Sequence, residues 1–144
     1  MTTEEKNRDN KLAGELFLKS NRDSAGVVET FSGLQYKIDT LGKGAKPLIS
    51  DSVTIRYTGS RVDGIVFTNT TSSLSVEEQI KGMREGLMLM PEGSVFDLYI
   101  PCYLAYASQS NSYYYDGNLV SIPAYSALHF RVKLEKVIPV SLED

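Results

Sequence analysis

The sequence predicts an α+β domain, in which several antiparallel strands carry one internal helix on one face, preceded by an N-terminal helical extension. From residue 32 onward, several segments alternate apolar and polar residues with the period of two that is typical of half-buried strands. One internal segment has helical spacing instead, which favours an α+β arrangement. The 144 residues suit a single globular domain (residues 31–144) with an extension and linker before it (residues 1–30).

The extension is predicted to contain a helix over about residues 5–20. Thr2 and Glu5 have the spacing of a capping box, in which each side chain accepts a hydrogen bond from the backbone N–H of the other residue. One face of this helix carries Leu12, Leu16 and Phe17. Because the segment is highly charged and its apolar pattern is weak, a frayed or docking appendage is favoured over a dimerisation element. Residues 21–30 are interpreted as a linker.

The strands are predicted from four alternating segments. They cover residues 34–38, 53–57, 95–100 and 128–134, and the last has the clearest alternation in the chain. Pro101 ends the third segment or marks an edge strand, because proline lacks the N–H that a strand ladder requires. The only histidine, His129, falls on the polar face of the last segment, where a solvated position is favoured over a role as ligand or base.

The internal helix is predicted from Ile80, Met83 and Leu87, which recur at helical spacing. Ser75 and Glu78 have capping-box spacing, so a start before Ile80 is also open.

The supply of reactive residues excludes most catalytic chemistries. With one histidine and one cysteine (Cys102), the chain has no His pair, no intramolecular disulfide and no multi-cysteine zinc site, and we expect no cofactor and no metal. Phosphate-binding loops and nucleophile-elbow motifs are absent from the sequence. The formal net charge of −3 disfavours nucleic acid as a partner, and no apolar run is long enough to span a membrane. The candidates that remain for a functional site are aromatic and aliphatic residues at strand ends and at the helix start.

The order and spacing of these residues resemble the FKBP-type peptidyl-prolyl cis-trans isomerases over about residues 32–138. The ordered blocks are Tyr57-Thr58-Gly59, Asp63-Gly64-x-x-Phe67, Ile80-x-Gly82, Glu85-Gly86-Leu87-x-x-Met90-x-x-Gly93, Ile100-Pro101-x-x-Leu104-Ala105-Tyr106, and Ile122-Pro123-x-x-x-x-Leu128-x-Phe130-x-Val132-x-Leu134. The segment from Gly26 to Tyr36 is similar to the macrophage-infectivity-potentiator-like bacterial subgroup. The resemblance implies an antiparallel sheet of five or six strands wrapped around one short helix, with the active site in the apolar hollow between them.

The resemblance also implies roles for individual residues. Those expected in catalysis are Tyr57, Phe67, Thr68, Tyr106 and Phe130. Those expected to bind substrate are Val76, Gln79, Ile80, Met83 and Ile122. In this scheme three aromatic rings line a proline pocket, while the Ile80 backbone N–H and the Tyr106 hydroxyl donate to substrate carbonyls. Such chemistry suits this chain, because rotation about an X-Pro bond needs no nucleophile and no proton transfer.

The chain departs from the family pattern inside the expected pocket. Thr68 follows Phe67 where the family usually has Asp, which weakens a polar contact. Met83 stands where the pocket floor is usually Trp, which gives a softer floor. Ala107 replaces a Gly, so easy access to positive φ is lost.

The segment from Ala107 to Ser121 is interpreted as a long loop, a kind of segment that is usually functional or mobile. Two interpretations of its tyrosines, Tyr113–Tyr115, are open: they cap the pocket or contact a client, or they face solvent.

Two functions are also open. The first, which we favour, is a peptidyl-prolyl isomerase acting on folding proteins. The alternative is a binding module or chaperone with little turnover, which the missing aspartate favours. The expected partners are proline-containing polypeptides and macrolide ligands bound with reduced affinity, and the short extension favours a monomer or weak dimer. The resemblance implies an exported or periplasmic protein, whereas the start of the chain lacks the features of a signal peptide and leaves a cytoplasmic location as the alternative.

Overall fold

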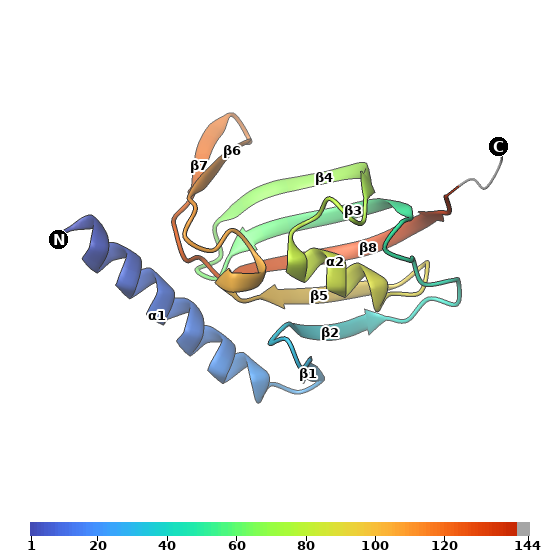
Figure 1. Cartoon of the computed structure of the whole chain (residues 1–144), viewed down its shortest axis with the longest axis horizontal. Coiled ribbons are helices and arrows are strands. Elements are labelled where there is room, and N and C mark those ends of the chain that lie inside the picture. Colours follow the sequence, from blue (N-terminus) through green and yellow to red (C-terminus); the bar gives the residue numbers. More distant parts are fainter. Residues whose placement is uncertain (141–144) are drawn as a thin grey trace.

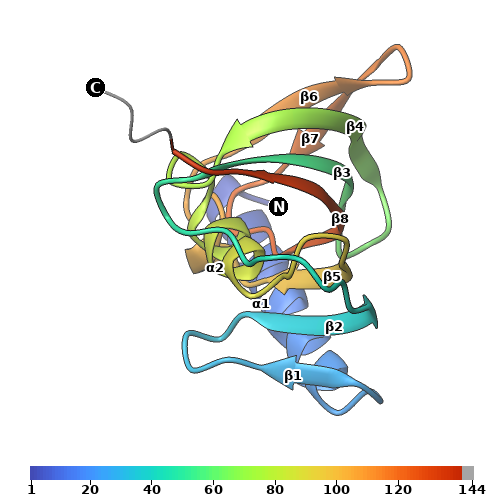
Figure 2. The same ribbon diagram turned by 90° about the vertical axis from the view of Figure 1, so that its right-hand side faces the viewer.

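The computed structural model describes residues 1–140 and contains one six-stranded antiparallel sheet (Figure 1 and Figure 2). The order of its strands is β1-β2-β5-β8-β3-β4. The strands are β1 (Val27–Glu29), β2 (Gln35–Thr40), β3 (Ser52–Arg61), β4 (Val66–Ser75), β5 (Val95–Ile100) and β8 (Leu128–Ile138). The α+β class and the sheet that the sequence predicts are therefore confirmed. Within residues 1–140, no helix is both long enough and apolar enough to span a membrane.

The helix α2 (Lys81–Met88) lies against one face of this sheet (Figure 2). Gly82 and Gly86 allow the close approach, because a Cβ atom on Gly86 would lie 2.5 Å from Leu98 Cδ1, and Gly82 is crowded by Ile100 in the same way. The helix begins at Lys81 with no side-chain cap, so the earlier start that the capping-box spacing suggested is wrong. The preceding residues instead belong to β4 and to a turn in which the Gln79 N–H donates to the Val76 carbonyl.

Strands β5 and β8 present different residues to their two faces. Toward α2 they contribute Phe96, Leu98, Phe130 and Val132 to a buried core. Toward the opposite face, the side chain of His129 is 33% exposed and bonds to Asp97 with 2.8 Å between Nε2 and Oδ1. The histidine therefore lies on the polar face, as predicted, but it is only partly solvated, because a partly buried carboxylate on the neighbouring strand lies within its reach.

The extension forms the helix α1 (Thr3–Arg22), which docks on the domain (Figure 1). The predicted capping box is present. The Asn10 amide donates to the Ala124 carbonyl (2.7 Å), and the rings of Phe17 and Tyr99 lie 6.1 Å apart. The two leucines of the predicted apolar face point elsewhere, since Leu12 is 51% and Leu16 57% exposed.

Two segments interpreted as linker or loop contain strands. Within residues 21–30, β1 pairs with β2. Within the segment from Ala107 to Ser121, β6 (Asn111–Tyr115) and β7 (Asn118–Ile122) form a separate hairpin. Its turn residues Asp116 and Gly117 have φ of 51° and 79°, as a type I′ turn requires.

Ala107, at the entry to this hairpin, adopts a positive φ of 52° although it is not glycine. Its N–H donates to the Cys102 carbonyl (2.9 Å) and its carbonyl accepts from the Tyr125 N–H (2.8 Å). Replacing the family's glycine therefore does not remove the left-handed conformation, because backbone hydrogen bonds on both sides hold it.

Candidate active site

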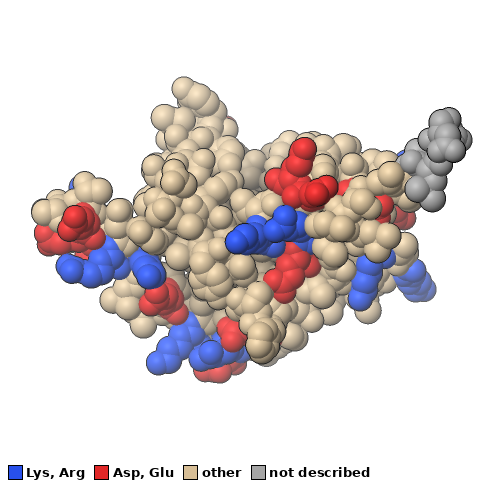
Figure 3. All heavy atoms as spheres, in the orientation of Figure 1, with Lys and Arg blue, Asp and Glu red and all other residues tan. Residues whose placement is uncertain are grey.

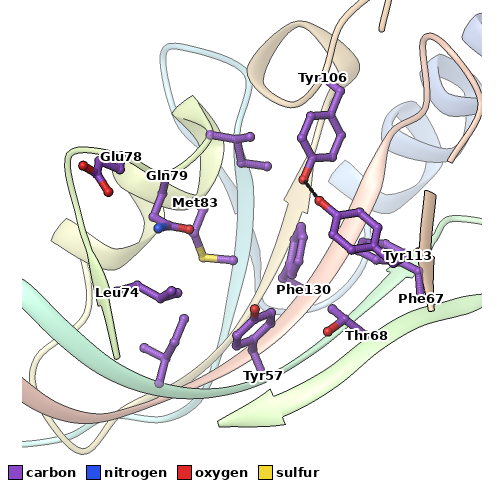
Figure 4. A pocket seen from close by; sticks show the side chains of 12 residues that line it. Tyr57, Phe67, Thr68, Leu74, Glu78, Gln79, Met83, Tyr106, Tyr113 and Phe130 are labelled. Carbon is purple, nitrogen blue, oxygen red and sulfur yellow. Dashed lines mark hydrogen bonds between the residues drawn. The ribbon is translucent and has the colours of Figure 1, made fainter. Parts of the chain in front are cut away.

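A cavity of about 260 Å³ lies between α2 and the strands β3, β4 and β8 (Figure 4). The residues that line it are Ile55, Tyr57, Phe67, Thr68, Leu74, Glu78, Gln79, Ile80, Met83, Tyr106, Tyr113 and Phe130. Of these lining residues only Glu78 is charged, and Figure 4 shows it at the opposite end of the view from the rings of Phe67 and Tyr113. The aromatic end of the cavity is thus apolar with hydroxyl groups at its edge.

The sheet brings three aromatic rings together at this end. The ring of Phe130, on β8, lies edge-on to that of Phe67, on β4, with 5.7 Å between centroids. The Tyr57 ring, on β3, is 6.1 Å from the Phe130 ring. Gly59 makes the arrangement possible, because a Cβ atom there would lie 2.7 Å from the Phe130 ring and 2.9 Å from the Phe67 ring. The glycine of the Tyr57-Thr58-Gly59 block is therefore required by packing.

Ile80 and Met83 form the side of the cavity nearest α2. Met83 is buried, with 3% of its surface exposed, in the position that the sequence assigned to the pocket floor. Ile80 is the N-cap residue of α2, and no backbone carbonyl among residues 1–140 accepts its N–H. A free backbone donor at the edge of an apolar cavity is available to a bound carbonyl group.

Tyrosine hydroxyls supply the other polar groups of the cavity. The Tyr106 and Tyr113 hydroxyl oxygens are hydrogen-bonded at 2.6 Å, and the Tyr113 ring lies 5.4 Å from that of Phe67 (Figure 4). Burial raises the pKa of Tyr106, and the hydrogen bond to Tyr113 raises it further. Burial and the proximity of Tyr113 also raise the pKa of Tyr57, although the Thr68 hydroxyl opposes this. The hydroxyls of Tyr57 and Tyr106 therefore stay neutral around pH 7.

The structure places most of the predicted site residues around this cavity. Eight of the ten line it. The other two, Val76 and Ile122, are fully buried in the core and are not among the lining residues. Among residues 1–140, no group of three or more side chains is placed to hold a metal ion.

Four lining residues were missed by the sequence reasoning: Ile55, Leu74, Glu78 and Tyr113. Alternation along β3 could have found Ile55, because it shares a strand face with Tyr57. Tyr113 belongs to the trio whose role the sequence left open. It reaches the cavity, whereas Tyr114 is 82% exposed.

The chain belongs to the family of FKBP-type peptidyl-prolyl cis-trans isomerases. The family model with that description matches residues 43–135. A second model, described as the domain amino terminal to FKBP-type peptidyl-prolyl isomerase, matches residues 1–38. The resemblance inferred from the ordered motifs is thereby confirmed.

The relatives include bacterial proteins of the macrophage-infectivity-potentiator and FkpA types. The outer membrane protein MIP of Legionella longbeachae is 44% identical over 110 residues, which cover 73% of this chain and 47% of the relative. The crystal structure of FkpA from Escherichia coli superimposes with a TM-score of 0.84 at 32% identity, covering 95% of this chain and 63% of that one. A peptidyl-prolyl cis-trans isomerase from Pseudomonas syringae pv. tomato gives a TM-score of 0.81 at 26% identity, over 92% and 96% of the two chains. The chain spans about half the length of the first curated relatives it matches.

Proposed function

We propose that this chain accelerates the cis–trans isomerisation of X-Pro bonds in polypeptides. The observation that carries the proposal is the aromatic end of the cavity, where the rings of Tyr57, Phe67 and Phe130 enclose an uncharged space. Membership in the FKBP-type family supports the same activity. The names of several relatives include the term peptidyl-prolyl cis-trans isomerase.

The proposed mechanism is non-covalent. The barrier to rotation, about 18–20 kcal/mol, comes from amide resonance, which keeps the imide planar and separates charge between oxygen and nitrogen. The twisted transition state has lost this charge separation, so an apolar environment favours it relative to the planar ground state. Each 1.4 kcal/mol of this preference is worth about a tenfold rate increase.

The hydrogen-bond donors at the edge of the cavity hold the substrate in this scheme. The proline ring packs between the aromatic rings, and the Ile80 N–H and the Tyr106 hydroxyl donate to carbonyl groups on either side of it. Met83 closes the floor. These contacts fix the chain on both sides of the rotating bond, so that rotation is confined to that bond.

The substrates proposed are proline-containing segments of unfolded polypeptides, because a cavity open to the surface accepts an extended chain more readily than a folded one. We also propose that the protein acts after export, since the relative from Legionella longbeachae is named an outer membrane protein. Macrolide binding with reduced affinity and a monomeric or weakly dimeric state remain predictions.

The test is the exchange rate of a short X-Pro peptide, measured by NMR exchange spectroscopy with and without the protein. We expect acceleration at catalytic concentrations. If the wild type binds the peptide without accelerating its exchange, the proposal of isomerase activity is rejected and the protein is a binding module.

A pair of variants isolates the Ile80 donor. Ile80 has φ of −57°, which proline can adopt, so Ile80→Pro removes the N–H with little change in backbone conformation. Ile80→Ala is the matched control, because both variants lose the isoleucine side chain. We expect kcat/KM to be about fivefold lower for Ile80→Pro than for Ile80→Ala, which is the effect of one hydrogen bond of about 1 kcal/mol. Equal values at equal thermal stability would remove this N–H from the site.

A further inference from the structure

The hairpin of β6 and β7 brings one tyrosine to the cavity. Successive side chains of a strand point to opposite faces, so Tyr113 and Tyr114 point in opposite directions. Tyr113 is 36% exposed and lies against Phe67, whereas Tyr114 is 82% exposed. The tight turn and the pairing of Tyr113 with Val120 fix the register, and a shift by one residue would exchange the two tyrosines.

We propose that Tyr113 is a positioning residue for Tyr106, and that the β6–β7 hairpin places Tyr113 beside it. The inference rests on the proposed isomerase function and extends it to a residue from a segment outside the ordered family motifs. Tyr113 acts through its hydroxyl, on Tyr106, and through its ring, as a continuation of the aromatic wall.

The Tyr106 and Tyr113 hydroxyls carry one proton each. A hydrogen bond between them uses one proton, so the accepting tyrosine keeps its own proton available. When a substrate carbonyl lies beside Tyr106, the arrangement that satisfies all partners has Tyr113 donating to Tyr106 and Tyr106 donating to the carbonyl. Each hydrogen bond in such a chain polarises the next and strengthens it.

The same contact restricts the rotation of the Tyr106 side chain. Tyr106 lies in the segment between the 3₁₀ helix Cys102–Leu104 and the hairpin, outside any regular element. Without a partner its ring and hydroxyl would lose conformational freedom on binding a substrate. The 2.6 Å bond to Tyr113, itself held by the Phe67 ring at 5.4 Å, removes that freedom in advance.

Packing alone does not explain a tyrosine at position 113. A phenylalanine would cover Phe67 equally well, and it would not bring a second hydroxyl into a partly desolvated cavity. In the free protein the two hydroxyl groups satisfy each other through their hydrogen bond of 2.6 Å. Substrate binding then adds a third member to an existing pair.

The test is a double-mutant cycle on the full chain with Tyr113→Phe, Tyr106→Phe and the double variant. We expect each single variant to weaken peptide binding and to raise KM about fivefold, with kcat nearly unchanged, because a bond to a flanking carbonyl is present in both the ground state and the transition state. The double variant should be no weaker than Tyr106→Phe alone. Tyr114→Phe is the matched control, from the same hairpin, and should behave as the wild type.

Two results would overturn the inference. One is a Tyr113→Phe variant with wild-type KM and peptide affinity. The other is a double variant whose loss equals the product of the two single losses, which would mean that the hydroxyls act independently.

Failure of the proposed function gives a different result. A wild type that does not accelerate exchange rejects the isomerase, but the same cycle read as peptide dissociation constants still decides the role of Tyr113. A wild type that neither accelerates exchange nor binds an X-Pro peptide overturns both.

Discussion

The two faces of β8 and β5 differ completely in chemistry although they alternate residue by residue. Toward α2 the strands carry Leu98, which lies in the core, and Phe130, which lies in the core and also lines the cavity. Toward the opposite face, residues on the same strands carry charges: Asp97 accepts from His129 (2.8 Å) and from Arg131 (3.0 Å between Nη1 and Oδ2). The ring of His129 stacks on that of Tyr99 with 4.7 Å between centroids.

This difference shows how the period of two keeps charge out of the proposed site. A charge in contact with the imide itself, unlike one paired by a hydrogen bond at the edge of the cavity, would favour the planar, charge-separated form over the twisted one. The space-filling view shows charged side chains along α1 and around α2, while the surface over β6 and β7 is uncharged on that face (Figure 3). We therefore expect substitutions on the face toward α2 to alter catalysis and packing. Substitutions on the opposite, charged face should alter stability and its dependence on pH.

Adjacent residues of β8 give the largest expected contrast. Phe130→Ala removes a side chain that is only 5% exposed, and it should lower the free energy of unfolding by about 3–5 kcal/mol. His129→Ala, one residue away on the other face, should cost only about 1 kcal/mol. Urea denaturation of both variants measures this. Equal losses would contradict the division into two faces.

The fold could be predicted from the sequence wherever periodicity was strong. The alternation over residues 128–134 identified β8, and the spacing of Ile80, Met83 and Leu87 identified α2. Ser75 and Glu78 misled because a capping-box spacing also occurs in a strand that runs into a turn. The β6–β7 hairpin was missed because its strands carry mostly polar residues and tyrosines, whose pairing is decided by the Asp116-Gly117 turn rather than by burial.

The site could be predicted only as far as the ordered motifs reached. Tyr57, Phe67, Tyr106 and Phe130 fall in those motifs and line the cavity. Tyr113 lies in a segment between motifs, so nothing in its spacing linked it to Tyr106. Their contact depends on how the hairpin folds back over β4, which is a tertiary effect.

On the charged face, Asp97→Asn should have the next largest effect. Burial alone would raise the pKa of Asp97, but the hydrogen bond to His129 and the charges of His129 and Arg131 outweigh it, so that its pKa lies below the usual 3.8. A carboxyl whose pKa is lower in the folded state stabilises the fold above its ordinary pKa, and this stability is lost as pH falls through the folded value. We expect the variant to lose about 1.5–3 kcal/mol at pH 7.

The same variant should lose much less at acidic pH, where Asp97 of the wild type is itself protonated. Urea denaturation at neutral and at acidic pH separates the two cases. A loss that is the same at both would show that the charge of Asp97 is irrelevant. Isomerase activity should be unchanged, because Asp97 does not line the cavity.

Thr68→Asp tests the uncharged face of the sheet. It places a carboxylate beside the cavity, at the position where the family pattern has aspartate. Thr68 lies next to Tyr57 (Figure 4), and a carboxylate there would accept a charge-assisted hydrogen bond from the tyrosine hydroxyl. We expect an increase of about fivefold in kcat/KM or in macrolide affinity, equivalent to about 1 kcal/mol.

Thr68→Asn is the control for this change, because it has the shape of aspartate without the charge and should remain near the wild type. If both variants leave activity and affinity unaltered, the polar contact at position 68 is dispensable in this chain.

The smallest expected effect is that of pH on catalysis. Burial raises the pKa of Tyr106, and burial likewise raises that of Tyr57, so both hydroxyls keep their protons well above neutral pH. Because their folded pKa values are raised, their contribution to stability is complete below the ordinary tyrosine pKa and is lost only as pH rises through the folded values. The isomerisation rate should therefore be flat between about pH 6 and 9. A rate that instead changed with pH in that range would mean that an ionising group acts at the site. It would contradict the division of the sheet into an uncharged catalytic face and a charged stabilising face.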